Sequence, residues 1–481
     1  MRRYAFVILF FVVLVTPFVL RQAIGTPAGD RPPAPTGDAL KLVIVTPHVE
    51  SIRREFAQAF SDWHQQRFGQ PVEIDWRSYG AAQIVKFFDA SRVSYDTFGN
   101  YGVDLVWGGG DALFEDQLKK GGHLQPVTLP PELMNAAFAV PDLGGLPLFD
   151  RGSPPQWFGT ALSSFGIAYN RDVVAYLGLP EPKTWRDLAD PRYRGWVVMA
   201  DPTLSSSAKA AYMTVIERAM ADAAQQGRSE DQGWAEGMGL LRQIAANARL
   251  FTDASSALPG QISSGDVAAG MTIDFHSLNQ IDMLPPRADG TKRMAYVEPV
   301  NATAVNPDPI AVAKTRGEVN PLALRFIEFV LSEAGQKLWY TPAGQPGGPR
   351  ESSLYRLPIR ASLYASDPVL KGKANPFTAA AGFNTSAARK RTFRILGETI
   401  EFSCMDVLED LRQTRRIILE SPRATELDAK LGTFPFDQQE ALRREKQWNS
   451  AAPVDRLALQ RKWTNEFREE YRKLRAEARG S

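Results

Sequence analysis

Strand and helix patterns alternate along most of this chain of 481 residues. A β-branched run at 42–45 is followed by apolar residues at helical spacing, and a second strand at 72–76 is also followed by a helix. A third strand, 103–107, leads into three glycines and a helix that begins at Asp111. The same alternation continues as far as Pro358. Repeated units of this kind predict an α/β fold, with a parallel or mixed sheet covered by helices on both faces.

The turns after these strands are candidate ligand sites, because ligands of such sheets bind beyond the carboxyl ends of the strands. Thr46 lies in the first turn, Ser78 in the second, and Gly110 and Asp111 in the third. Turns also need Gly, Ser and Asp for their own backbone geometry. A single turn therefore does not establish a site.

The string TWRDLADPRYRGWVVMADPTLSSS, at 184–207, is the most informative about function. Its apolar run at 196–200 predicts a buried strand, and an alanine-rich helix is predicted at 208–224. A helix N-terminus presents unpaired N–H groups and a partial positive charge, which suits an anionic ligand. The three hydroxyls at this helix start are candidate ligand contacts: Ser205, Ser206 and Ser207. The alternative is ordinary capping by serine.

Composition indicates a globular chain with room for two or three domains. With 56 basic and 54 acidic residues the net charge is +2, which gives no reason to expect a nucleic-acid partner. The single cysteine, Cys404, excludes an intramolecular disulfide and a CxxC metal site. We expect it to be buried in an apolar role.

The N-terminus has the layout of an export signal, with Arg2 and Arg3 before an uncharged apolar run at 4–20. The run also reaches the lower length limit for spanning a bilayer. Residues 1–25 are therefore expected to be a cleaved signal peptide or a membrane anchor, and a Pro- and Gly-rich linker follows at 26–39. Either outcome predicts a periplasmic or extracytoplasmic body.

The C-terminal 116 residues, 366–481, differ from the body, with 22 Lys and Arg against 17 Asp and Glu. They show helical patterns and no strand pattern, with helices predicted at 379–394, 398–420, 438–447 and 455–478. The last helix carries an apolar stripe of Leu457, Trp463, Phe467, Tyr471 and Leu474. Packing of this stripe on its own chain is the favoured interpretation, and a partner-binding helix is the alternative.

Several motifs of the body resemble the extracellular solute-binding proteins of bacterial ABC importers, in the branch that includes ferric-ion and phosphonate-type receptors. The resemblance covers about 40–360. It is carried by VDLVWGGGDALFEDQLKKGGHLQPV, by FGIAYNRDVV, by the string at 184–207 and by PLALRFIEFVLSEAGQKLW at 321–339. Four motifs in the family's order make the resemblance specific.

The resemblance implies a two-lobed periplasmic-binding-protein fold of type II, with a mainly helical, charged extension at 366–481. Lobe 1 would take 40–160 and 275–365, and lobe 2 would take 161–274. The family's ligand loops fall on Thr46, Ser78, Gly110, Asp111, Ser205, Ser206, Ser207 and Asp274. The implied partners are a small-molecule solute and an ABC permease in the membrane, with the membrane itself a partner if the N-terminal segment is uncleaved. We expect a monomer without cofactor or metal.

The expected solute is a small organic anion or a zwitterion. Asp111 and Asp274 oppose a purely anionic ligand, whereas a zwitterion places its anionic end on the serines and its amine on an aspartate. Ferric iron is the alternative, since hard cations prefer oxygen donors. Ferric receptors of this family carry adjacent tyrosines, however, and Asp274-Phe275-His276 stands near that position here.

Two further functions remain open. An enzyme is not expected, because the chain has no GxSxG, HExxH or GxxxxGK motif. A membrane-tethered sensor that signals through its extension is the other alternative, because members of the family usually end near the equivalent of residue 360.

Overall fold

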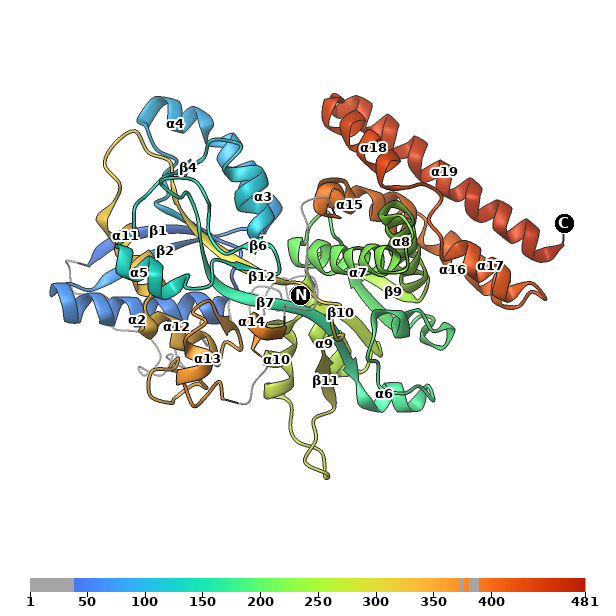
Figure 1. Ribbon diagram of the computed structural model, residues 1–481, viewed down its shortest axis with the longest axis horizontal. Helices are drawn as coiled ribbons and strands as arrows, with labels where there is room; N and C mark the ends of the chain where they lie inside the picture. The colour runs from blue at the N-terminus through green and yellow to red at the C-terminus, as the bar shows by residue number, and fades with distance from the viewer. Residues whose placement is uncertain (1–38, 372–374, 380–388, 481) are drawn as a thin grey trace, which may run out of the picture.

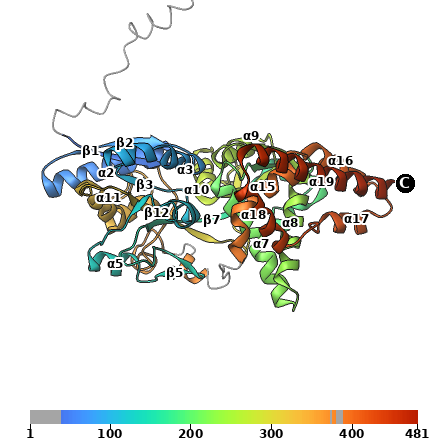
Figure 2. The same cartoon turned by 90° about the horizontal axis from the view of Figure 1, so that it is seen from above.

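The computed structural model describes residues 39–371, 375–379 and 389–480 of the chain. Two lobes lie side by side, one long strand passes from the first into the second, and a group of helices packs on the second lobe (Figure 1). Seen from above, these C-terminal helices run along the second lobe to the tip farthest from the first (Figure 2). The predicted α/β fold with a mainly helical extension is confirmed.

The sheet of the first lobe forms as the alternating pattern predicts. β1 (Leu40–Thr46) pairs in parallel with β2 (Val72–Ser78) and β3 (Leu105–Trp107), and the antiparallel β12 (Val305–Ala313) lies beside β3. Apolar side chains of these strands pack against α2 (Glu50–Phe68) in the core. The lobe also contains α3 (Ala81–Ala90), α4 (Arg92–Phe98), η1 (Leu113–Leu118), β4 (Leu124–Gln125), α5 (Pro131–Ala137), β5 (Asp142–Leu143) and β6 (Leu146–Pro147).

Strand β7 (Phe158–Asn170) connects the two lobes, and all 13 of its residues are buried. Its first half pairs with β12, and its second half pairs with β10 (Ala269–Ile273). Because β7 belongs to both pairings, the lobes share one sheet in the order β2-β1-β3-β12-β7-β10-β8-β9. The motif FGIAYNRDVV begins at Phe165, so its first residues form the second half of this strand.

The second lobe confirms the strand and helix predicted from the string at 184–207. β8 (Val197–Ala200) lies between β10 and β9 (Ala248–Thr252), and α7 (Ser206–Gln225) follows it. α8 (Glu230–Ala246) packs along α7. The other elements are α6 (Arg171–Tyr176), η2 (Trp185–Ala189), η3 (Pro191–Tyr193), η4 (Ser255–Ala257), α9 (Leu258–Ser264), α10 (Asp274–Met283) and β11 (Met294–Val297).

Strand β11 lies close to the predicted boundary between the lobes. It falls in the range 275–365 that we predicted for lobe 1, and it pairs with the same half of β7 as β10. The lobe limits stay predictions.

The motif at 321–339 forms two helices rather than one. α11 (Pro321–Leu331) ends before Ser332, whose backbone is extended at φ −66° and ψ 164°. The Ser332 hydroxyl accepts a hydrogen bond from the Gly335 N–H at 3.2 Å and so caps α12 (Glu333–Tyr340). The chain continues through β13 (Leu357–Pro358), α13 (Leu363–Ser366) and α14 (Pro376–Ala379).

The extension is helical, with different boundaries from those predicted. Part of the helix predicted at 379–394 lies outside the described residues, and the helix predicted at 398–420 is interrupted by the π-helical turn η7 (Glu401–Met405). Cys404, in that turn, is buried as predicted. The other elements are η6 (Arg389–Thr392), α15 (Phe393–Ile400), α16 (Leu408–Leu419), α17 (Ala424–Leu431), α18 (Gln438–Ser450) and α19 (Pro453–Arg479).

Buried contacts anchor the extension on α8. The fully buried Arg242 donates from Nε and Nη2 to the Leu431 carbonyl, at 2.9 and 2.6 Å, and from Nη1 to Glu470 at 2.9 Å. Close by, a Cβ on Gly239 would lie 1.9 Å from the Gly432 carbonyl oxygen, so this contact requires glycine. The extension is therefore part of the second lobe's fold.

The apolar stripe of α19 packs on its own chain, as favoured. Trp463, Phe467, Tyr471 and Leu474 are buried in the main core, whereas Leu457 is exposed. Their burial against α16 and η7 leaves little of the stripe for a partner.

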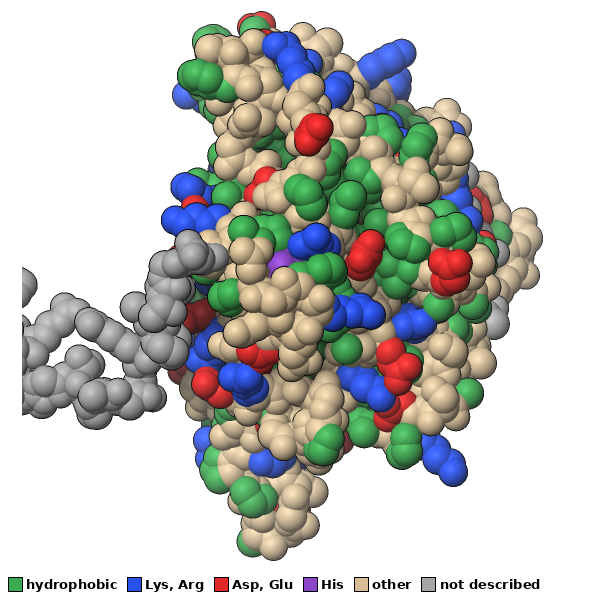
Figure 3. Space-filling view, turned by 90° about the vertical axis from the view of Figure 1, so that its left-hand side faces the viewer, with side chains coloured by type: hydrophobic (Ala, Val, Ile, Leu, Met, Phe, Trp, Pro, Cys, Tyr) green, Lys and Arg blue, Asp and Glu red, His purple; other side chains and the backbone are tan. Residues whose placement is uncertain are grey.

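No helix in the described ranges has the length and apolar character needed to cross a bilayer. The predicted signal or anchor at 1–25, and the linker up to residue 38, lie outside those ranges. On the end of the first lobe, basic and acidic side chains are interspersed, which agrees with the balanced net charge of +2 (Figure 3).

Candidate functional site

A pocket open to solvent lies where the two lobes and the extension meet, and its empty space of about 410 Å³ includes open solvent. The first lobe contributes the predicted site residue Asp111, together with neighbouring side chains of its helix. The second lobe contributes one face of α7, and β12 contributes its segment beside β7. The lining residues are Asp111, Ala112, Asp116, Ala210, Met213, Thr214, Glu217, Ala304, Asn306, Lys390 and Phe393.

A glycine loop places Asp111 at the pocket. Gly108, Gly109 and Gly110 all have positive φ, at 92°, 108° and 84°, which favours glycine. A Cβ on Gly108 would lie 2.7 Å from His48 Nε2, so a side chain has no room there. At the predicted site residue Gly110 a Cβ would meet nothing within 4 Å, so only its positive φ favours glycine there.

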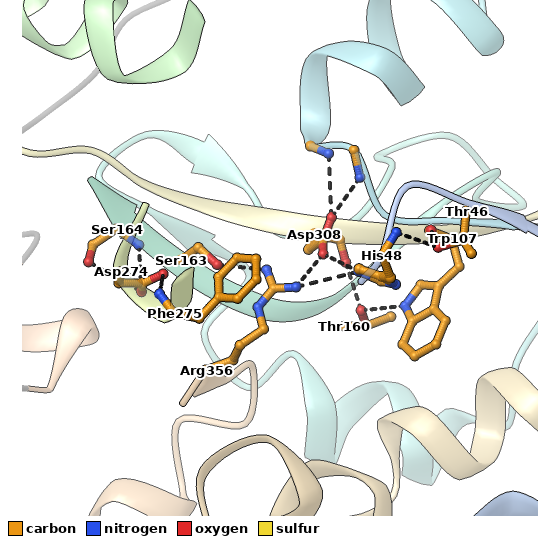
Figure 4. Close-up of polar contacts among 12 residues, drawn as sticks. Thr46, His48, Trp107, Thr160, Ser163, Ser164, Asp274, Phe275, Asp308 and Arg356 are labelled. Carbon is orange, nitrogen blue, oxygen red and sulfur yellow. Dashed lines mark hydrogen bonds and ion pairs between the residues drawn. The ribbon is translucent and has the colours of Figure 1, made fainter. Parts of the chain in front are cut away.

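The loop is held by a buried network of charged side chains (Figure 4). Asp308 Oδ1 accepts hydrogen bonds from the Gly109 N–H at 2.9 Å and the Gly110 N–H at 3.4 Å. Its Oδ2 accepts from His48 Nε2 at 2.7 Å and from Arg356 Nη1 at 2.5 Å. Asp308 thus connects β12 to the loop and to the segment that follows α12.

Burial and neighbouring charges have opposite effects on the pKa of Asp308 and on that of His48. Burial alone would raise the pKa of Asp308, but the Arg356 guanidinium and His48 hold it well below its usual range. Burial lowers the pKa of His48, and Asp308 opposes that shift. Arg356 also donates to Ser163 Oγ at 2.6 Å and lies over the Phe275 ring at 4.6 Å, so the network reaches the second lobe.

The predicted serine triplet divides into one cap and two available hydroxyls. Ser205 is the N-cap of α7, and its Oγ accepts from the Ala208 N–H at 3.3 Å. The half-buried Ser206 and Ser207 have no side-chain hydrogen bond within the described chain. Ser206 precedes the pocket residue Ala210 by one helical turn, so the two lie on the same face of α7.

Thr46 and Ser78 lie side by side in the register of β1 and β2, in different environments. The Thr46 hydroxyl is buried; it donates to the Trp107 carbonyl at 2.6 Å and accepts from the His48 N–H at 3.1 Å. Ser78 is exposed. The structure therefore uses the Thr46 hydroxyl internally, to join β1 to β3.

Asp274 lies at the start of α10, beside strand β7. Its Oδ2 accepts from the Ser164 N–H at 2.9 Å, and its Oδ1 accepts from the Phe275 N–H at 2.7 Å. The Ser164 hydroxyl also donates to Glu298. Burial, with Glu298 adding to it, raises the pKa of Asp274 to about 7.

This raised pKa predicts that stability falls as the pH rises. The unfolded chain loses the Asp274 proton near pH 4, whereas the folded chain keeps it up to about pH 7, so deprotonation favours unfolding between these values. We expect the free energy of unfolding to fall by about 2 kcal/mol from pH 5 to pH 7 on this account. Asp274→Asn should remove that part of the pH dependence in urea titrations, and the exposed Asp253→Asn should retain it. An equal slope in Asp274→Asn and in wild type would contradict the assignment.

The described residues contain no group of three or more His, Cys, Asp and Glu side chains placed to hold a metal ion. His276 follows Phe275, near the position where ferric receptors of the family carry adjacent tyrosines. Burial lowers the pKa of its ring to about 3, and Arg356 adds to that shift.

The family model of the bacterial extracellular solute-binding proteins matches residues 111–354, about half of the chain. The chain belongs to this family. Membership of this solute-binding family implies that the body acts in the periplasm, outside the cytoplasm. The matched range begins at Asp111 and includes the string at 184–207, α7 and β12.

Two solved structures share the fold of this solute-binding protein. The periplasmic binding protein AfuA of Actinobacillus pleuropneumoniae, with fructose-6-phosphate bound, aligns over 78% of this chain and 97% of its own, with a TM-score of 0.52 and 16% identity. A protein described as mediating two-component signal transduction aligns over 74% and 99%, with a TM-score of 0.51 and 12% identity. These likenesses confirm the two-lobed periplasmic-binding-protein architecture.

Among curated proteins, the chain is 28% identical over 178 residues to the phosphoglycerate transport regulatory protein PgtC of Salmonella typhimurium. The match covers 37% of this chain and 39% of the relative, so the chain spans about two fifths of that relative's length.

Sequence reasoning did not find Asp308, Arg356 or Lys390. Asp308 stands between Pro307 and Pro309, ahead of the apolar run 310–313 of the same strand, and a carboxylate buried in such a strand requires a partner. That signal was available in the sequence, although the identity of the partner was not.

Proposed function

We propose that this protein is an extracytoplasmic receptor that captures a small organic anion or zwitterion in the pocket between its lobes and delivers it to an ABC-type importer. The observation that carries the proposal is the lining of the pocket, to which both lobes and strand β12 contribute. A solute held there contacts both lobes, and such contacts favour the closed arrangement of a two-lobed protein.

The polar groups of the pocket favour a solute with both charges. Asp111 is an anion, and Asn306 Oδ1 is a buried acceptor with no hydrogen-bond partner among the described residues, so both suit an ammonium group. Ser206 and the N-terminus of α7, one helical turn from Ala210, suit a carboxylate, phosphonate or phosphate. A zwitterion satisfies both sets of groups.

Two relatives support an anionic part in the solute. The name of the Salmonella relative concerns phosphoglycerate, and the Actinobacillus protein holds fructose-6-phosphate. Both compounds carry a phosphate, which the start of α7 suits on physical grounds.

Calorimetric titration and thermal unfolding of the full chain test this proposal, with phosphonates, amino acids, sugar phosphates, polyamines and ferric salts as probes. A ligand at a hundred times its dissociation constant should add about 2.7 kcal/mol of stability. We expect Ser206→Ala to weaken binding of the stabilising compound about fivefold, through one lost hydrogen bond, and the exposed Ser450→Ala to leave it unchanged. Product formation from the compound would instead indicate an enzyme, and stabilisation by ferric salts alone would indicate an iron receptor.

Solute sensing is a second candidate function. The Salmonella relative is named as a regulator of transport, and here the extension is anchored on one lobe while its residues Lys390 and Phe393 line the pocket. Movement of the lobes would thus change the contacts of the extension. A variant with a destabilised extension tests this function. If it still takes up the solute but loses the transcriptional response to it, the result would favour sensing over delivery.

A further inference from the structure

The extension reaches the pocket through the short segment 389–394. Lys390 and Phe393, on η6 and α15, line the pocket together with residues of both lobes. Lys390 Nζ lies 3.7 Å from Asp111 Oδ2, and the two side chains are 23% and 17% exposed. This segment lies outside the range 111–354 that the family model matches.

Contacts with both lobes position the segment. On the second lobe, Trp234 Nε1 donates to the buried Thr392 hydroxyl at 2.9 Å. On the first lobe, Arg394 Nη2 donates to the Asp116 carbonyl at 2.6 Å. The segment therefore spans the junction of the lobes.

Among the described residues that line the pocket, Lys390 alone carries a positive charge. Its distance of 3.7 Å from Asp111 exceeds that of a hydrogen bond, so its ammonium keeps donors for another acceptor. Two further acidic side chains line the pocket: Asp116, which pairs with Lys120 at 2.6 Å, and Glu217, which is 1% exposed. Lys390 and Asp111, whose mutual contact is longer than a hydrogen bond, are the oppositely charged pair of the lining.

We propose that the extension forms part of the solute site, and that Lys390 binds the anionic group of the solute while Asp111 binds its ammonium group. The inference rests on the proposed receptor function and adds a binding residue and a charge pattern to it. In the absence of solute, Lys390 and Asp111 partly neutralise each other. A zwitterion replaces this loose pair by two closer ones.

Three small compounds test the two charges one at a time and together. Ethylphosphonate carries the anionic group, ethylamine carries the ammonium group, and 2-aminoethylphosphonate carries both. Calorimetric titration of the full chain with each should show the zwitterion binding best. Lys390→Met should weaken the binding of 2-aminoethylphosphonate and of ethylphosphonate at least tenfold. It should strengthen the binding of ethylamine, because Asp111 loses its competing cation. Lys390→Arg should stay within about threefold of wild type, and Lys371→Met, which removes an exposed lysine outside the pocket, should match wild type.

The outcomes distinguish this inference from the receptor proposal. If wild type binds the zwitterion and Lys390→Met binds all three compounds as wild type does, the role of Lys390 is wrong and the receptor proposal stands. If wild type binds none of the three, the zwitterion class and the role of Lys390 are both wrong. If Lys390→Met does not fold, Asp111→Asn is the deciding variant. It should weaken the binding of ethylamine and leave the binding of ethylphosphonate unchanged. An equal loss of binding for both compounds would overturn the charge assignment.

Discussion

Asp308→Asn is expected to lower the free energy of unfolding by about 3–5 kcal/mol, the usual cost of removing one partner from a buried ion pair. The carboxylate accepts from Arg356 at 2.5 Å and from His48 at 2.7 Å, and Arg356 is only 3% exposed. The amide has no charge to offset the buried guanidinium. Urea unfolding of the full chain measures this loss.

The same carboxylate predicts a sensitivity to acid. Because Arg356 and His48 hold the pKa of Asp308 below its unfolded value, its contribution is present above about pH 4 and is lost as the pH falls further. Asp308→Asn should therefore lose less stability than wild type on acidification. The exposed Asp253→Asn serves as the matched control. If Asp308→Asn lowered the free energy of unfolding by less than about 1 kcal/mol, as little as the control does, the network would contribute little to stability.

Arg242→Met should cost about 3 kcal/mol or more, because it removes the donors of the buried Leu431 carbonyl and the partner of Glu470. Arg242 donates to the carbonyls of Leu431 and Thr433, and it has no exposed surface. The loss should be local, so hydrogen exchange should increase most in α17 and α19. Exchange rates resolved by segment, together with urea unfolding, measure both effects.

Arg443→Met is the control for this prediction, because its side chain is 79% exposed and it pairs only with Glu440 on the same helix. It should change stability by less than about 0.5 kcal/mol. Unchanged exchange in the extension of Arg242→Met would contradict the anchoring role. An increase confined to the first lobe would contradict it as well.

The candidate site was predictable where the signal was local. Asp111 and Ser206 follow strand ends and begin helices, so strand pattern and turn chemistry were enough to nominate them. Thr46 was nominated by the same rule, but its hydroxyl bonds to Trp107, 61 positions away, and so serves the fold. A rule based on position along a strand does not distinguish a hydroxyl that faces solvent from one that joins two strands.

The sequence by itself determined the α/β class, the order of the strands and helices along both lobes and the helical character of the extension, because hydrophobic periodicity and turn residues act over a few positions. Only the tertiary structure decided which polar groups meet. His48 joins Asp308 across 260 positions, and the extension brings Lys390 to Asp111. Such contacts depend on how whole elements pack, and no local pattern records them, because buried charges require a partner without specifying where in the chain it lies.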